Sequence, residues 1–263
     1  MTLKKVISMS RRTDPRWHAD KFIAVLEQKY PPSAVHTLVV WTKFPQAVLT
    51  QPYRDVLKRY EQVYCQLTIT GLGGTPLEPH VPPWEEAASL LPALADFVGG
   101  AERVRLRVDP LVFMEYEGGR FSNLTRVEAI LDRALDAGIR TFSTSFIEVY
   151  PKVESRLRAH GFKAVCLSPG AKRRVIERLS APIREKGGIL HTCAVPGFPV
   201  SRCIDGELLT RLHPRGEPCR VDRAAGQRAL CGCTHSVDIG WYNMRCPSGC
   251  LYCYANPQMS FHL

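Results

Sequence analysis

The sequence has no long apolar run. None of its stretches approaches the ~20 consecutive apolar residues that a membrane-crossing helix needs. The first apolar run, Val6 to Met9, is also shorter than the core of ~7 residues that defines a signal peptide. Hydrophobic residues make up 45% of the chain, which excludes a disordered protein. We therefore expect a cytoplasmic, globular protein with no membrane partner.

Cysteine is scarce in the first 192 residues, where only Cys65 and Cys166 occur, and the other eight of the ten cysteines follow. A secreted disulfide scaffold is usually shorter than ~100 residues and spreads its cysteines throughout. Cysteines crowded at one end of a longer chain indicate instead reduced thiols that bind a metal or a cluster. Cys65 and Cys166 lie in apolar runs and are expected to be small core residues. No role is assigned to Cys219.

Short apolar runs alternate with amphipathic stretches up to residue 195. The predicted strands are Lys5–Ser10, Thr37–Lys43, Val63–Thr70, Val104–Asp109, Arg140–Phe146 and Ile189–Ala194. The predicted helices are Ala19–Gln28, Gln46–Gln62, Trp84–Phe97, Arg126–Ala137, Val153–His160 and Ala171–Glu185. Thr125 is expected to cap the fourth of these helices. Continuous apolar strands alternating with helices are typical of an α/β fold with a parallel sheet or barrel.

This alternation ends at residue 196, where proline and glycine become frequent. The remaining stretch carries seven of the ten cysteines. We expect a single domain over residues 1–263, with a β/α core in 1–195 and a cysteine-rich extension in 196–263 that folds back onto it.

Polar side chains stand at the ends of six predicted strands. Because the carboxyl ends of parallel strands form the ligand-binding rim of an α/β fold, we expect a polar pocket there. The candidate residues are Ser10, Arg11, Arg12, Asp14, Lys43, Thr70, Arg107, Asp109 and Ser145. For Arg107 and Asp109 an internal ion pair is an equal alternative, since residues i and i+2 of a strand point the same way.

Cys246, Cys250 and Cys253 form a C-x3-C-x2-C motif. Three thiolates in so short a loop can bind three corners of a cubic iron–sulfur cluster and leave its fourth iron open. Zinc is the alternative, but zinc sites usually use paired C-x2-C units. Only Cys250 and Cys253 have that spacing.

The motif resembles the cluster loop of the radical S-adenosylmethionine (radical SAM) enzymes, in which an aromatic residue, here Tyr252, precedes the third cysteine. The flanking residues 242–246 and 249–256 are similar to the spore-photoproduct-lyase branch of that superfamily. Most of the chain resembles the DUF1848 family, which has a radical-SAM-like cysteine cluster at its C-terminus. The stretches that carry this second resemblance are residues 10–14, 41–43, 67–71, 77–79, 107–110, 203–205, 231–233 and 236–240.

The resemblance implies a [4Fe–4S] cluster that cleaves S-adenosylmethionine reductively to a 5′-deoxyadenosyl radical. It implies an electron donor such as flavodoxin or ferredoxin and an unidentified substrate, which we expect to be anionic. A carboxylate on the cofactor suits the guanidinium of Arg11, Arg12 or Arg107. The expected partners of its ribose and amino groups are Asp14, Thr70, Asp109 and Ser145, with Ser10 and Tyr252 also at the cofactor site.

In radical SAM enzymes the cluster loop follows the first strand of the barrel, whereas here it follows the predicted strand Val237–Tyr242. A circular permutation accounts for the difference, because domains whose termini lie close together tolerate permutation. We therefore predict a partial, circularly permuted TIM-like (β/α) barrel in which residues 237–242 lie beside Lys5–Ser10.

A second set of cysteines comprises Cys193, Cys203, Cys231 and Cys233. Four thiolates suit a second [4Fe–4S] cluster or a zinc ion, and we favour the cluster. Four free thiols are the alternative.

The net charge of +10 leaves a second function class open. A zinc- or cluster-stabilised nucleic-acid-binding protein without catalysis would also be basic. The basic groups at 152–158 and 172–174 are expected on solvated helix faces without interleaved aromatic residues, whereas nucleic-acid binding would favour aromatic residues among them. An anionic substrate or an acidic electron donor explains the charge equally well.

Overall fold

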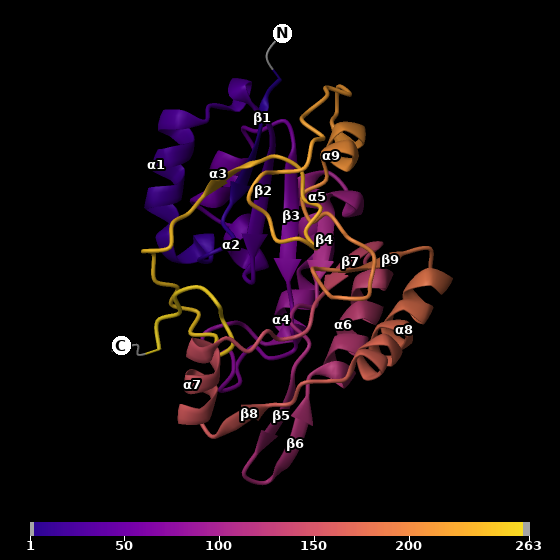
Figure 1. Cartoon of the computed structure of the whole chain (residues 1–263). Coiled ribbons are helices and arrows are strands. Elements are labelled where there is room, and N and C mark those ends of the chain that lie inside the picture. The colour runs from indigo at the N-terminus through magenta and orange to yellow at the C-terminus, as the bar shows by residue number, and fades with distance from the viewer. Residues whose placement is uncertain (1–2, 260–263) are drawn as a thin grey trace.

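The structure is a computed structural model and describes residues 3–259. Its centre is a parallel sheet with the strand order β10-β1-β2-β3-β4-β7-β9 (Figure 1). The strands are β1 (Lys5–Met9), β2 (Val35–Thr42), β3 (Val63–Thr68), β4 (Val104–Arg107), β7 (Thr141–Thr144), β9 (Ile189–Thr192) and β10 (Val237–Ile239). The predicted α/β class with a parallel sheet is confirmed. Within residues 3–259 the edge strands β9 and β10 do not pair with each other, so the sheet is open rather than a closed barrel.

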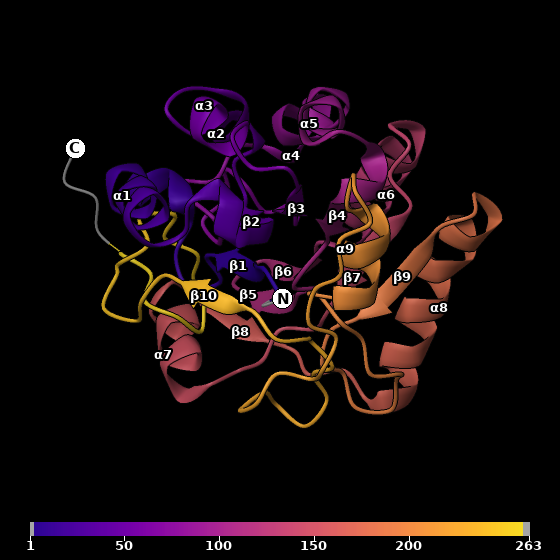
Figure 2. The same ribbon diagram turned by 90° about the horizontal axis from the view of Figure 1, so that it is seen from above.

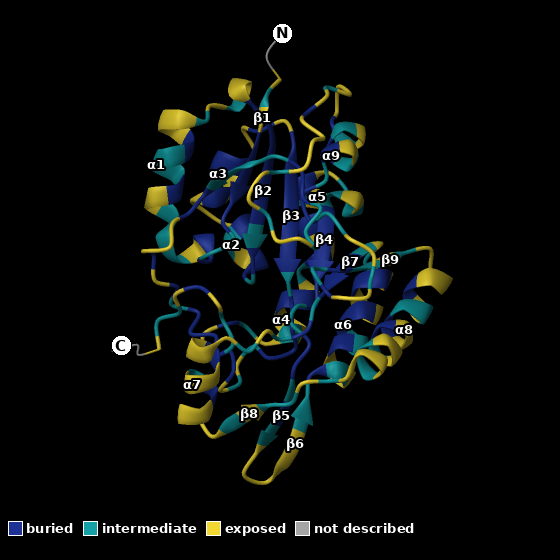
Figure 3. Cartoon of the chain, viewed as in Figure 1, coloured by how far each residue is buried: buried dark blue, intermediate teal, exposed yellow. Residues whose placement is uncertain are grey.

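Most helices cover the outer face of the curved sheet (Figure 2). They are α1 (Ala19–Lys29), α2 (Pro45–Leu49), α3 (Tyr53–Leu57), α4 (Trp84–Ser89), α5 (Leu91–Val98), α6 (Leu124–Asp136) and α8 (Pro169–Glu185). Alternate strand residues such as Ile7, Leu38 and Leu106 point to this side and are fully buried in the main core. Figure 3 shows this burial along the strands and along the inner sides of the helices. None of the helices in residues 3–259 has the length and apolarity needed to span a bilayer.

The cysteine-rich extension covers the inner face of the sheet. Val6, Val39 and Tyr64 point to this side and pack against Ile204 and Leu209 of the extension. Leu209 belongs to α9 (Gly206–Leu212), a helix that the sequence pattern did not predict. The extension then leads to β10 at the edge of the sheet.

The last strand pairs in parallel with the first. Val237 and Ile239 lie opposite Ile7 and Met9, which confirms the predicted neighbourhood of the two ends of the sheet. The strand stops at residue 239 instead of 242 because Gly240 turns the chain with a φ of 128°. A Cβ atom at Gly240 would overlap the side chain of Ser10, so only glycine allows the two strand ends to approach this closely.

Three expectations about local structure were wrong. The helix predicted over Gln46–Gln62 is two short helices, because Pro52 lacks the backbone N–H that a continuous helix needs. The helix expected at Trp84–Phe97 divides at Leu90 into α4 and α5. Asn123 occupies the N-cap position of α6 in place of Thr125, and its buried side chain binds the backbone of Thr70, Pro110 and Val112 instead of capping the helix.

A small antiparallel sheet lies beyond the carboxyl ends of the main strands (Figure 1). It consists of β5 (Phe113–Tyr116), β6 (Gly119–Ser122) and β8 (Phe162–Ala164), with α7 (Pro151–Ala159) beside it. These short strands were not predicted. Cys166, which follows β8, is exposed and its predicted core position was wrong, whereas the buried position of Cys65 is confirmed.

Candidate functional site

The C-x3-C-x2-C loop follows β10 and lies beside α7, beyond the carboxyl ends of the sheet (Figure 1). The indole N–H of Trp17 donates to Ser248 Oγ at 2.9 Å, and the N–H of Leu251 donates to the carbonyl of Leu77 at 3.0 Å. From α7, Arg156 donates to the carbonyls of Leu251, at 3.1 Å, and Cys253. Contacts from three separate segments therefore hold this loop in place.

The three thiols of the loop are free. Cys246 and Cys250 are buried, and Cys253 is partly exposed. Burial raises the pKa of Cys250, with the carboxylate of Glu78 adding to the effect, and burial also raises the pKa of Cys253. A bound metal would stabilise the thiolates that burial alone disfavours. Three soft thiolates in one rigid loop are a donor set that fits an iron–sulfur cluster.

A buried polar network lies directly against the loop and centres on Glu78, which is 1% exposed. Its Oε1 accepts hydrogen bonds from Lys43 Nζ at 2.9 Å, from Thr70 Oγ1 at 2.7 Å and from the hydroxyl of Tyr252. Lys43 Nζ also lies 3.0 Å from the Tyr252 oxygen. Burial opposes the charged form of Lys43, but the Glu78 carboxylate and the Cys250 sulfur outweigh it and raise the pKa of Lys43.

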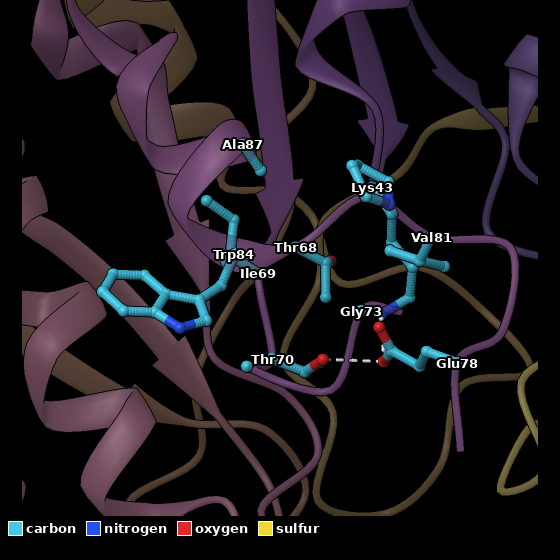
Figure 4. A pocket seen from close by; sticks show the side chains of 11 residues that line it. Lys43, Thr68, Ile69, Thr70, Gly73, Glu78, Val81, Trp84 and Ala87 are labelled. Atoms are coloured by element: carbon cyan, nitrogen blue, oxygen red, sulfur yellow. Dashed lines mark hydrogen bonds and ion pairs between the residues drawn. The ribbon is translucent and has the colours of Figure 1, made fainter. Parts of the chain in front are cut away.

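Figure 4 shows the small cavity beside this network, with Thr70 and Glu78 joined across it. Its volume of about 10 Å³ is space for about one water molecule. Of the predicted rim residues, Lys43 and Thr70 line it. The cavity can therefore hydrate the network but cannot hold a substrate.

Sequence reasoning did not assign a role to Glu78. Its motif, Leu77-Glu78-Pro79, does belong to the stretches that resemble DUF1848. A carboxylate between apolar residues in a loop rich in glycine and proline was the available signal.

Asp14 fixes the segment after β1 to the end of β2. Its carboxylate accepts the backbone N–H of Lys43 at 2.7 Å, the N–H of Arg16 at 3.1 Å and the hydroxyl of Thr42 at 3.0 Å. Burial raises its pKa to about 6. With both oxygens engaged by the protein, Asp14 positions the rim rather than facing a ligand.

Arg11 and Arg12 share one carboxylate at the edge of the sheet. Arg12 is paired with Asp238 of β10 and stacks on Tyr242 with its guanidinium carbon 4.4 Å from the ring centre. Arg11 Nε lies 3.7 Å from Asp238, and the side chains of both arginines are 25% exposed. Two cations facing one anion leave a net positive charge here. The hydroxyl of Tyr254, next to Cys253, donates to the Arg11 carbonyl at 3.2 Å, so this segment contacts the end of the C-x3-C-x2-C loop.

Arg107 and Asp109 form the internal ion pair that was the alternative to a ligand site. Asp109 also accepts a hydrogen bond from Ser145. The guanidinium of Arg107 lies 3.1 Å from Cys203 Sγ and 5.2 Å from the centre of the Trp41 ring. Burial opposes the charge on Arg107, but Cys203 and Asp109 outweigh it and raise its pKa. Arg107 therefore faces the second cysteine set.

The predicted residues thus lie at the same end of the sheet, in three adjoining groups. Trp41 joins two of the groups, because Arg11 and Arg107 both lie within 5.8 Å of its ring centre. In the first group Lys43 and Thr70 contact Glu78, and the second group contains Arg11 and Arg12. The third group contains Arg107, which lies against Cys203 of the second cysteine set. Ser10 is buried behind the second group, where its hydroxyl accepts the N–H of Arg12.

Sequence reasoning also missed a cluster of Glu61, His213 and Glu217, whose ligand-type atoms lie within 4.8 Å of one another. Lys4 lies 2.8 Å from Glu217, and Arg215 lies 2.6 Å from both carboxylates. These cations already balance the acidic charge, so the cluster is an ion-pair network.

The chain was compared with known proteins. Neither the curated proteins nor the solved structures gave a match. A family model described as "Domain of unknown function (DUF1848)" matches residues 25–255. The match includes Lys43, Glu78 and both cysteine sets, and it supports the resemblance drawn from the sequence motifs. Since it spans most of the chain, this protein belongs to the DUF1848 family.

Proposed function

We propose that this protein is a radical SAM enzyme in which Cys246, Cys250 and Cys253 hold a [4Fe–4S] cluster. The observation that carries the proposal is the C-x3-C-x2-C loop itself, fixed by three elements at the carboxyl end of a parallel sheet. The pairing of β10 with β1 supports it further, because it places the loop next to the first strand, as a permuted form of that fold requires. When bound, the cluster would supply an electron to S-adenosylmethionine and hold its amino and carboxylate groups.

The residues of the chain have separable tasks in this proposal. Arg11 and Arg12 attract the carboxylate of the cofactor, because Asp238 neutralises only one of the two charges. Lys43 is held by Glu78 and Tyr252 with its ammonium group near Cys250, where it lowers the electrostatic cost of a thiolate. Asp14 keeps the backbone of Lys43 in place. The excess positive charge at Arg11 and Arg12 suits an anionic substrate and an acidic electron donor.

The test is anaerobic reconstitution with iron and sulfide, followed by an assay for 5′-deoxyadenosine with S-adenosylmethionine and a chemical reductant. The parent protein and the Cys166→Ser control, altered at an exposed thiol, should form the product. The triple variant Cys246→Ala, Cys250→Ala, Cys253→Ala should form none and bind about four fewer irons. A triple variant that cleaves the cofactor at the parent rate would show the assignment to be wrong.

Nucleic-acid binding without catalysis is a second candidate function, supported by one surface. The aromatic residues Trp241, Tyr242 and Tyr254 are 45–67% exposed, and Arg12 stacks on one of them. Exposed aromatics beside arginines are the usual platform for stacked bases. Tight, salt-dependent binding of single-stranded DNA by a protein that makes no 5′-deoxyadenosine would favour this function.

A further inference from the structure

We propose that Cys193, Cys203, Cys231 and Cys233 form a separate site for one thiophilic metal ion, most simply zinc, on the inner face of the sheet. The site does not depend on the proposed function, since it shares no ligand with the C-x3-C-x2-C loop. It would join the end of β9 to the extension and to the segment that precedes β10.

The four sulfurs come from three places in the sequence and meet in one cluster of buried side chains. Cys203 Sγ lies 3.8 Å from Cys193 Sγ, and the N–H of Cys203 donates to Cys233 Sγ at 3.2 Å. The thiols of Cys203 and Cys231 both lie within interaction range of the Cys233 thiol. The sulfurs thus form a continuous row in the order 193, 203, 233, 231.

The turn that carries the last two cysteines is built for close approach. Gly232 donates its N–H to the carbonyl of Ser201 at 3.0 Å, so the turn lies flat against the segment that carries Cys203. A Cβ atom at Gly232 would lie 3.0 Å from Val200 and 3.2 Å from Arg202. A residue larger than glycine would push the two halves of the site apart.

The charge around the sulfurs also suits thiolates. Arg107 Nη1 lies 3.1 Å from Cys203 Sγ, and Arg228 acts on Cys193 and Cys231 through its charge. A zinc ion bound to four thiolates carries a net charge of about −2, and the two nearby guanidinium groups offset part of it. Arg107 is buried and also pairs with Asp109, whereas Arg228 is half-exposed and also pairs with Glu148, so each cation has a carboxylate partner besides the sulfurs.

The sulfur spacing favours one ion over a cluster. Four sulfurs around zinc, at ~2.3 Å from the metal, have neighbours about 3.8 Å apart, which matches the Cys193–Cys203 separation. A cubic cluster would bind each thiolate at a different iron and hold the sulfurs farther apart. Among the described residues no three of these sulfurs lie within 4.8 Å of one another, so metal binding requires the row to close. Its end members, Cys193 and Cys231, are only partly buried and can rotate inward.

The experiment measures zinc, iron and sulfide in full-length protein purified anaerobically without added metal. We expect about one zinc per chain in the parent, in Cys166→Ser and in the triple variant of the C-x3-C-x2-C loop. In the double variant Cys203→Ser, Cys233→Ser the zinc content per chain should fall at least tenfold, whereas the variant should still take up iron on reconstitution. Failure of the radical SAM proposal would change the iron and 5′-deoxyadenosine results alone, so the two proposals fail separately.

A measurement on the parent protein covers the case in which the double variant does not fold. Under native conditions an alkylating reagent should modify exposed Cys166 but spare Cys193 and Cys231, and a zinc chelator should make both reactive. The proposal is overturned by a parent without zinc, by zinc that stays in the double variant, or by Cys193 and Cys231 that react as fast as Cys166. A disulfide between any two of the four cysteines would overturn it too, as would iron and sulfide that remain in the triple variant.

Discussion

Glu78→Gln removes the negative charge from the buried polar network that lies against the C-x3-C-x2-C loop, and it keeps the size of the side chain. Among the described residues Glu78 is the one carboxylate that forms an ion pair with the ammonium group of Lys43, and three donors converge on its Oε1. A glutamine oxygen can still accept these bonds, but it leaves the buried ammonium group of Lys43 without a counterion. The variant therefore isolates the contribution of the charge.

The magnitude follows from the 2.9 Å separation of Lys43 Nζ and Glu78 Oε1. With an effective dielectric constant of ~20, two unit charges at that distance attract by about 6 kcal/mol. Part of this is offset because the glutamine no longer has a charged group to desolvate. Removal of one partner of a buried pair costs about 3–5 kcal/mol, and we expect Glu78→Gln to lower the free energy of unfolding by that amount.

Urea unfolding of four proteins measures this: the parent, Glu78→Gln, Lys43→Met and the double variant. The double variant removes both charges, so it should be more stable than either single variant, with a coupling energy above about 2 kcal/mol. Glu115→Gln is the matched control, because Glu115 pairs with Arg120 and Lys163 on the surface and its loss should leave the midpoint unchanged. A coupling energy below about 0.5 kcal/mol would refute the reasoning.

Three further predictions concern the rim and the cluster loop. Arg156→Ala should speed amide hydrogen exchange in residues 246–253 several-fold, because Arg156 holds two carbonyls of this loop. Arg158→Ala is the control and should not change the exchange, because Arg158 pairs with Glu154 on the same helix. Equal exchange rates in the two variants would contradict the role of Arg156 in holding the loop. Gly240→Ala should lower the thermal midpoint by roughly 5 °C or more, because the substituted residue must adopt a positive φ and collide with β1. Since burial raises the pKa of Asp14 to about 6, the folded state binds its proton more tightly than the unfolded state. As the pH rises from 4 to 6, the free energy of unfolding of the parent should therefore fall by about 2–3 kcal/mol relative to that of Asp14→Asn. Urea unfolding at several pH values measures this difference. If the two proteins lose stability in parallel, the pKa of Asp14 is not raised.

Strands β1, β2 and β3 could be predicted because most of their residues are apolar, and burial on both faces leaves that pattern in the sequence. The neighbourhood of β10 and β1 followed from the position of the cysteine motif at the end of the chain, and the structure confirms it. The short strands β5, β6 and β8 were missed because most of their residues are partly or fully exposed, so these strands leave no buried apolar run in the sequence.

The polar partners could not be predicted, because they depend on contacts between distant segments. Lys43 was a candidate from its place after a strand, but its counterion Glu78 lies in a loop with no pattern of its own. The Asn123 side chain makes three hydrogen bonds with backbone groups, and no local sequence feature predicts them. Cys166 lies in an apolar run, yet the strand before it is at the edge of a small sheet and leaves the thiol exposed. Local patterns therefore located the rim, while tertiary contacts decided which of its groups face one another.

The pairing of β10 with β1 also sets the order in which the protein can mature on the ribosome. Ile7 and Val237 are opposite each other although 237 − 7 = 230 residues separate them. At about 5–20 residues per second, the first strand waits at least ten seconds or so with one edge unpaired before its partner is synthesised. The extension, the edge of the sheet and the C-x3-C-x2-C loop must then assemble together as the last step, because β10 leads directly into the loop. A nascent chain that stalls before residue 237 would therefore present an open β1 edge and lack the three thiols of the C-x3-C-x2-C loop.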